Sequence, residues 1–293
     1  MDGFAPSDTH GNYKRPKGIL IDKISSYENY KEQIFLLVGN SCPWCHRTLL
    51  IHRLKNLSKQ VKVFCLEADI NSGQWVFIEK FRGCKTLNQF YKKGKQHNIF
   101  RPTLPLLFNF QNDQINILSN ESSQIIKILN SVKSESKYQA LNIKNCNQKF
   151  LDLIHNSIND GVYRCGFARN QSAYEKASKN LFAALNEVEN SLKRNKGEWI
   201  YGEELTYADI YLFPTLIRWE LIYSKLFKCT EQELSSFEKI IEWRLNFFKL
   251  SNVKRTCFDN EWKKDYYKAL FPLNPNQLIP ILPSLKEIMR LES

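Results

Sequence analysis

The sequence lacks an apolar run long enough to cross a bilayer, because its longest runs, such as residues 34–38, have the length of a β-strand. Residues 1–18 contain no apolar segment of the signal-peptide type. We therefore expect a cytoplasmic protein that has no membrane span.

Dense blocks of basic residues are also missing, although the net charge is +12. Lysine and arginine are spread along all 293 residues, and the densest run is YKKGK at 91–95. Nucleic-acid-binding chains concentrate their positive charge in a patch or an arm. The composition therefore predicts no nucleic-acid partner and a general attraction for small anionic molecules.

The cysteines predict neither a disulfide framework nor a metal site. There are eight of them, scattered along the chain, and only Cys42 and Cys45 are close in sequence. A reducing compartment keeps such cysteines as free thiols. Structural zinc needs four ligands, and no second close Cys or His pair exists to complete that set. We therefore expect no metal.

Strand-like and helical segments alternate in the first half of the chain, which is typical of a thioredoxin-like α/β domain. The order is strand, helix, strand, a long connection, and then a hairpin followed by a helix. Strands are expected at residues 33–39, 61–70, 104–110 and 114–118, and helical spacing of apolar residues is found at 48–57 and 119–130.

Helical periodicity alone continues from about residue 140, so the second half of the chain is expected to be all-α. The predicted fold class is thus an α/β thioredoxin-like N-terminal domain plus an all-α C-terminal domain. The predicted organisation is an N-terminal extension at 1–30, the thioredoxin-like domain at 31–132, and the all-helical domain with an extended tail at 140–293.

The motif NSCPWCHR at residues 40–47 stands between a predicted strand and a predicted helix. Proline is favoured at the first position of a helix, so the helix is expected to start near Pro43 with Cys42 at its N-terminus. Helix N-termini and Cys-x-x-Cys motifs lower the pKa of a cysteine to about 3.5–7.5. The two basic residues of the motif add positive charge if they lie close enough. We predict Cys42 as the nucleophile of a redox or thiol-transfer site, with Cys45 as a candidate resolving thiol.

Two further segments suit the binding of a small peptide. Pro105 begins a predicted strand, where a cis peptide bond would expose the backbone of Leu104 to an extended peptide, although an ordinary strand-initiating proline is the alternative. Glu121 and Ser122 begin a predicted helix and could bind an amino-acid head group, or could simply cap the helix. The Cys42 thiolate, the backbone of Leu104 and the helix start at Glu121 and Ser122 would match, in that order, the cysteinyl, peptide and γ-glutamyl parts of glutathione.

The chain resembles the glutathione transferase superfamily, and within it the glutathionyl-hydroquinone reductases of the Xi class, which is related to the omega class. The match runs from about residue 30 to 276, and the segments 159–168 and 208–218 are specific to this class. The residues that carry it are 42–47, 104–110, 119–130, 157–177, 205–229 and 260–275.

The resemblance implies a homodimer and a reaction in which Cys42 attacks the sulfur of a glutathionyl-hydroquinone. The hydroquinone leaves, and a second glutathione releases the first from Cys42 as oxidised glutathione. It implies that Tyr163 and Tyr266 contact the hydroquinone, where a phenol can hydrogen-bond or protonate the leaving ring. It assigns the binding of glutathione to Trp75, Arg101, Leu104, Glu121 and Ser122.

Two other functions remain open at the level of sequence. The family commonly has a residue without a thiol where Cys45 stands, so a dithiol mechanism is an alternative here. Such a protein would be a general glutathione-dependent thiol-disulfide or dehydroascorbate reductase. The other reading is a transferase-like fold that serves as a non-enzymatic binding or assembly module.

Overall fold

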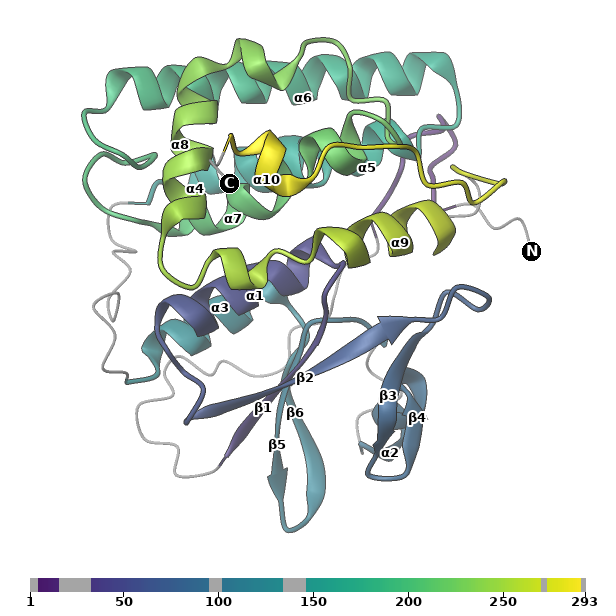
Figure 1. Cartoon of the computed structure of the whole chain (residues 1–293). Coiled ribbons are helices and arrows are strands. Elements are labelled where there is room, and N and C mark those ends of the chain that lie inside the picture. Colours follow the sequence, from purple (N-terminus) through teal and green to yellow (C-terminus); the bar gives the residue numbers. More distant parts are fainter. Residues whose placement is uncertain (1–4, 16–32, 95–101, 134–145, 270–272, 291–293) are drawn as a thin grey trace. The chain divides into compact units, whose positions relative to one another are not determined.

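A computed structural model describes residues 5–15, 33–94, 102–133, 146–269 and 273–290 (Figure 1). Contacts within the chain divide it into two units, a sheet unit and a helical unit. The sheet unit consists, among the described residues, of 33–94, 102–133 and 251–261. The helical unit consists of 5–15, 146–250, 262–269 and 273–290.

The sheet unit is built on a six-stranded sheet with the strand order β4-β3-β2-β1-β5-β6. The central pair β1 and β2 is parallel, and the other neighbours are antiparallel. The predicted order of strand, helix, strand and then hairpin and helix is confirmed. The strands are β1 (Ile34–Gly39), β2 (Val61–Ala68), β3 (Trp75–Phe81), β4 (Cys84–Thr86), β5 (Leu106–Gln111) and β6 (Gln114–Ser119).

The stretch treated above as a long connection contains secondary structure of its own. Strands β3 and β4 form an antiparallel pair at one edge of the sheet, and helix α2 (Leu87–Lys93) follows directly. Thr86 and Gln89 form a reciprocal capping box at the start of this helix. Phe90 anchors the helix on the sheet, because its ring lies 4.9 Å from the ring of Phe108 in β5.

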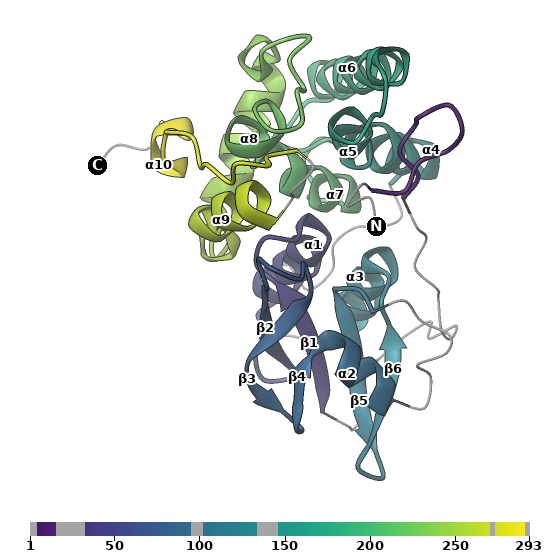
Figure 2. The same cartoon turned by 90° about the vertical axis from the view of Figure 1, so that its right-hand side faces the viewer.

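Helices α1 (Pro43–Leu54) and α3 (Ser122–Ser131) pack side by side in the sheet unit, as Figures 1 and 2 show. Helix α1 starts with proline at its first position, as predicted, and nearly all of its residues are buried. Residues 251–261 also belong to this unit, and their single 3₁₀ turn (Lys254–Thr256) contacts α1. A segment distant in sequence thus helps to cover the helix that follows the Cys-x-x-Cys motif.

The described residues of the helical unit contribute no strand to the main sheet and form helices, as expected for an all-α domain. Among the described residues, no helix is long and apolar enough to cross a membrane. Two π-helical turns, at Ile154–Asn159 and Trp219–Tyr223, lie between α-helices of the described part of this unit. The α-helices are α4 (Gln148–Leu153), α5 (Gly161–Gly166), α6 (Gln171–Arg194), α7 (Tyr207–Leu216), α8 (Glu238–Lys249), α9 (Asp259–Ala269), which begins in the sheet unit, and α10 (Leu285–Ile288).

A buried carboxylate organises the core of the helical unit. Asp209 forms a capping box with Thr206 at the start of α7. Its oxygens accept hydrogen bonds from the backbone and hydroxyl of Thr206, at 2.8 and 2.9 Å, and from the backbone of Ile200 at 3.1 Å. The indole N–H of Trp243 on α8 donates a further bond at 2.8 Å. One side chain therefore joins a helix start, a loop and a second helix.

Replacing Asp209 should destabilise the helical unit strongly. Asp209→Ala leaves four buried donors without an acceptor, so we expect a loss of about 3 kcal/mol or more in unfolding free energy. Urea denaturation measures it. Glu242→Ala is the matched control, because Glu242 forms only an exposed ion pair with Lys239, worth less than about 1 kcal/mol. Equal losses in the two variants would contradict this account.

Candidate active site

Cys42 lies between the end of β1 and the start of α1, where the sequence predicts it. A tight turn follows Gly39, and the backbone N–H of Cys42 donates to the carbonyl of Gly39 at 3.0 Å. Cys42 is the N-cap residue of α1, its side chain is half-buried, and it does not cap the helix by a hydrogen bond. The thiol thus lies at the positive end of a helix, a position that favours its anionic form.

Cys45, one turn further along α1, has a different environment. It is completely buried, and its Sγ accepts a hydrogen bond from the backbone N–H of Gly39 at 3.4 Å. Burial, together with the neighbouring Cys42, raises the pKa of the Cys45 thiol well above its usual value. A buried thiol that stays protonated is a poor nucleophile. All eight cysteines of the chain are free thiols.

The two basic residues of the motif are engaged in packing within the sheet unit. His46 is buried, and its Nε2 lies 2.8 Å from the hydroxyl of Thr256. Since that hydroxyl donates to the carbonyl of Val253 at 2.6 Å, the His46 ring is the donor. The guanidinium of Arg47 lies 4.4 Å from the ring centre of Trp44. His46 therefore joins α1 to the segment 251–261, whereas Arg47 packs on a residue of its own helix.

Trp75, at the start of β3, packs directly on the turn that leads to Cys42. A Cβ atom at Gly39 would lie only 2.3 Å from the Trp75 ring, so any larger residue at this position would collide with it. The ring is half-exposed. The structure thus brings Trp75, one of the residues assigned to glutathione, to the loop that holds Cys42.

The segments that contain Leu104 and Glu121 are joined by a hydrogen bond between the residues that precede them, Thr103 and Asn120. The Asn120 side chain donates to the hydroxyl of Thr103 at 3.3 Å, and the hydroxyl of Tyr91 donates to the carbonyl of Thr103 at 2.9 Å. The peptide bond between Leu104 and Pro105 is cis. Arg101 lies outside the described residues.

Glu121 is the N-cap residue of α3, and Ser122 is its first helical residue. The Glu121 carboxylate is half-exposed and does not cap the helix, whereas Ser122 is buried. Ser119 supports the turn, because its hydroxyl accepts from the backbone N–H of Glu121 at 3.1 Å and donates to Gln124 at 2.9 Å. This helix start offers a carboxylate beside the N–H groups of a first turn.

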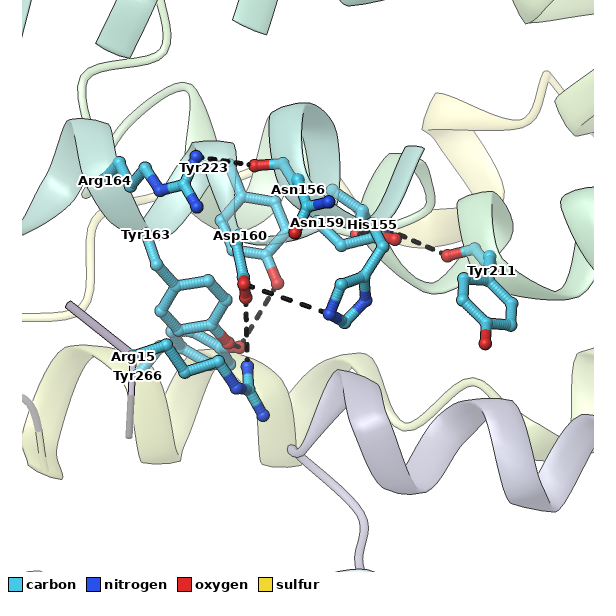
Figure 3. A network of polar contacts seen from close by, with 11 residues as sticks. Arg15, His155, Asn156, Asn159, Asp160, Tyr163, Arg164, Tyr211, Tyr223 and Tyr266 are labelled. Atoms are coloured by element: carbon cyan, nitrogen blue, oxygen red, sulfur yellow. Dashed lines mark hydrogen bonds and ion pairs between the residues drawn. The ribbon is translucent and has the colours of Figure 1, made fainter. Parts of the chain in front are cut away.

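Tyr163 and Tyr266, the two tyrosines assigned to the hydroquinone, form a pair within the helical unit (Figure 3). Their hydroxyls are 2.6 Å apart, and the hydroxyl of Tyr223 lies 3.3 Å from that of Tyr266. Burial, and then the neighbouring Tyr223, raise the pKa of Tyr266 well above its usual value. This phenol is therefore protonated at neutral pH and can donate a proton or a hydrogen bond.

Within the described ranges, no group of three or more His, Cys, Asp or Glu side chains could hold a metal ion.

The comparisons with known proteins agree with one another. A model for the glutathione S-transferase C-terminal domain matches residues 171–245. Glutathionyl-hydroquinone reductase PcpF of Sphingobium chlorophenolicum is 31% identical over 261 residues, which cover 85% of this chain and 82% of the relative. The chain belongs to the glutathionyl-hydroquinone reductases, the Xi class of the glutathione transferases.

Solved structures of the Xi class support this assignment. The Xi glutathione S-transferase of Phanerochaete chrysosporium has a TM-score of 0.83 and 26% identity, and the match covers 96% of both chains. The glutathione-bound structure of YqjG, a glutathione transferase homologue from Escherichia coli K-12, has a TM-score of 0.77 and 29% identity, over 88% of this chain and 87% of that one. The predicted fold class is thereby confirmed, and the chain is an enzyme of the glutathione transferase superfamily.

Membership of the Xi class leaves the roles of individual residues to be argued from geometry. Sequence reasoning missed Gly39, whose signal was a glycine at the end of a predicted strand, a place where another group often approaches the backbone. It also missed Tyr223, which carries no signal beyond its place in the segment 205–229.

The contact between Gly39 and Trp75 should be essential to the loop that holds Cys42. We expect Gly39→Ala to lower the unfolding free energy by about 1–3 kcal/mol, because the added methyl group collides with the ring. Urea denaturation measures the change, and combining it with Trp75→Ala should recover part of the loss.

Gly94→Ala is the matched control in the same unit, since a Cβ there would have no neighbour nearer than 3.4 Å. If Gly39→Ala proved as stable as this control, the proposed close packing would be wrong.

Proposed function

We propose that this enzyme reduces glutathionyl-hydroquinones to hydroquinones, with glutathione as co-substrate, through a mixed disulfide on Cys42. The main support is the half-buried thiol of Cys42 at the N-terminus of α1. The relatives add to it, because PcpF is named a glutathionyl-hydroquinone reductase and YqjG was solved with glutathione bound.

In the first step, the Cys42 thiolate attacks the sulfur that joins glutathione to the hydroquinone ring. A sulfur–sulfur bond forms, and the bond between that sulfur and the ring carbon breaks. The electron pair of the broken bond stays on the ring, which takes up one proton. The products are the free hydroquinone and the Cys42–glutathione mixed disulfide.

In the second step, the thiolate of another glutathione attacks the glutathione sulfur of the mixed disulfide. Oxidised glutathione leaves, and the Cys42 thiolate is regenerated. The sum is that one glutathionyl-hydroquinone and one glutathione give one hydroquinone and one oxidised glutathione. The two electrons that reduce the ring come from the two glutathione sulfurs, so no further reductant is required.

Glutathione would bind along the sheet unit. Its peptide backbone would pair with Leu104, and its γ-glutamyl head group would bind at Glu121 and Ser122, where a carboxylate faces its ammonium group and helix N–H groups face its own carboxylate. Trp75 would cover the tripeptide beside the Cys42 loop. Arg101 is assigned to glutathione by resemblance alone.

Tyr163 and Tyr266 would supply the proton, or the hydrogen bond, that the leaving ring needs. Burial raises the pKa of Tyr266, so this phenol stays protonated and is suited to donate a hydrogen bond to the leaving ring. The hydroxyl of Tyr223, 3.3 Å from that of Tyr266, extends this group of phenols.

A monothiol mechanism fits this site better than a dithiol mechanism. Cys45 is fully buried, its pKa is raised, and its sulfur accepts the N–H of Gly39, so it is poorly suited to displace glutathione from Cys42. This argues against the form of the general disulfide-reductase alternative that uses both cysteines. The homodimer and the cytoplasmic location stay predictions.

Replacing each cysteine in turn distinguishes the functions. Cys42→Ala should lower turnover of a glutathionyl-hydroquinone by about a thousandfold or more, because it removes the nucleophile. Cys45→Ala, the matched control, should keep it within about threefold. After a glutathionyl-hydroquinone is added, intact mass spectrometry should show one glutathione bound to the wild-type enzyme and none bound to Cys42→Ala. Excess glutathione should remove the adduct from the wild-type enzyme.

Two other outcomes would favour the alternative functions. Loss of turnover in Cys45→Ala, with the Cys42–glutathione adduct still formed, would indicate dithiol chemistry. If oxidised glutathione left no adduct on the wild-type chain and no turnover were measured, a binding module would be favoured.

A further inference from the structure

Residues 5–15 form a closed loop on the helical unit, which we call the N-terminal clasp. Ser7 and Tyr13 form an isolated antiparallel bridge, and the N–H of Lys14 donates to the carbonyl of Pro6 at 2.9 Å. The Asp8 carboxylate closes the loop from inside, because it accepts the backbone N–H of Asn12 at 2.9 Å. The clasp therefore has a defined shape without any apolar core of its own.

The start of α6 holds one side of the clasp. The backbone N–H of Arg169 donates to the carbonyl of Gly11 at 3.0 Å, and its guanidinium donates to the carbonyl of Ala5 at 2.8 Å. Asn170 donates to the carbonyl of His10 at 3.0 Å. Gly11 has a φ of +78°, and a Cβ there would lie 2.5 Å from the Asn170 side chain, so the close approach requires glycine.

An ion pair holds the other side of the clasp. The guanidinium of Arg15 lies 3.3 Å from the carboxylate of Asp160, the residue before α5 (Figure 3). The Asp160 side chain is only 8% exposed, and His155 lies 4.0 Å from its other oxygen. A carboxylate this buried interacts with its partner much more strongly than a surface pair does.

The clasp brings Tyr13 to the tyrosines described above. Its ring stacks on that of Tyr163, with centres 6.5 Å apart, and lies 5.5 Å from that of Phe167. Tyr223, Phe227 and Tyr266 are buried behind them, whereas Tyr13, Tyr163 and Phe167 are half-buried. These six residues form an aromatic cluster whose accessible edge includes a ring supplied by the clasp.

We propose that Tyr13 determines specificity for the aromatic part of the substrate, and that Arg15 is its positioning residue. This inference rests on the proposed function. A hydroquinone ring that meets Tyr163 would also meet the ring stacked on it, and flat aromatic rings favour such offset contacts. A glutathione adduct that has no ring would gain nothing from Tyr13. The ion pair with Asp160 fixes the end of the clasp two residues away from Tyr13.

The test compares two substrates, glutathionyl-hydroquinone and the mixed disulfide of glutathione with 2-mercaptoethanol. Tyr13→Ala should lower the ratio of their kcat/KM values by about tenfold, mainly through a higher KM for the hydroquinone adduct. Tyr13→Phe keeps the ring and should restore the ratio. Arg15→Gln should lower it as well, and Arg15→Lys, which keeps the charge, should recover most of the loss.

His10→Ala is the matched control, because the clasp uses His10 only through its backbone and the change should leave the ratio within about twofold. An unchanged ratio in Tyr13→Ala, or an equal loss with both substrates, would overturn the inference, since a merely structural role affects both equally. A wild-type enzyme that used only the mixed disulfide would reject the proposed function, and this inference with it.

Discussion

The proposed chemistry depends on one constraint, that Cys42 lies where β1 ends and α1 begins. The first N–H groups of a helix have no acceptor within it, so they and the helix dipole stabilise negative charge at that end. Gly39 maintains this geometry through its carbonyl, which accepts from Cys42, its N–H, which donates to Cys45, and its Cα, which lies against Trp75. Cys45 therefore belongs to the scaffold of the site, although it stands in a motif that suggests dithiol chemistry.

Much of the fold could be predicted from the sequence because the elements around the motif carry their own pattern. Strand β1 is a continuous apolar run, and α1 begins at a proline. Strand β3 was missed for a physical reason. Only Phe77 among its residues is buried, and Ile78 is 69% exposed, so its apolar residues do not alternate as those of a half-buried strand do.

The sequence predicts only those parts of the site that depend on residues close together in the chain. The motif locates Cys42, since helix starts depend on neighbouring residues, and the start of α3 follows in the same way. The contacts that complete the site join distant parts of the chain, such as Gly39 with Trp75, Thr103 with Asn120, and His46 with Thr256. The N-terminal clasp is of the same kind, because hydrogen bonds and one ion pair hold it, and these leave no periodic signal.

The most direct test is the rate at which iodoacetamide alkylates Cys42 as a function of pH, measured in Cys45→Ser, which leaves one motif thiol and keeps a side-chain acceptor for the N–H of Gly39. Only the thiolate reacts, so the midpoint of the rate profile reports the ionisation of this sulfur. A thiol stabilised by the start of a helix should have its midpoint below about pH 7.5. A midpoint near 8.5, as for cysteine in a free peptide, would contradict the account.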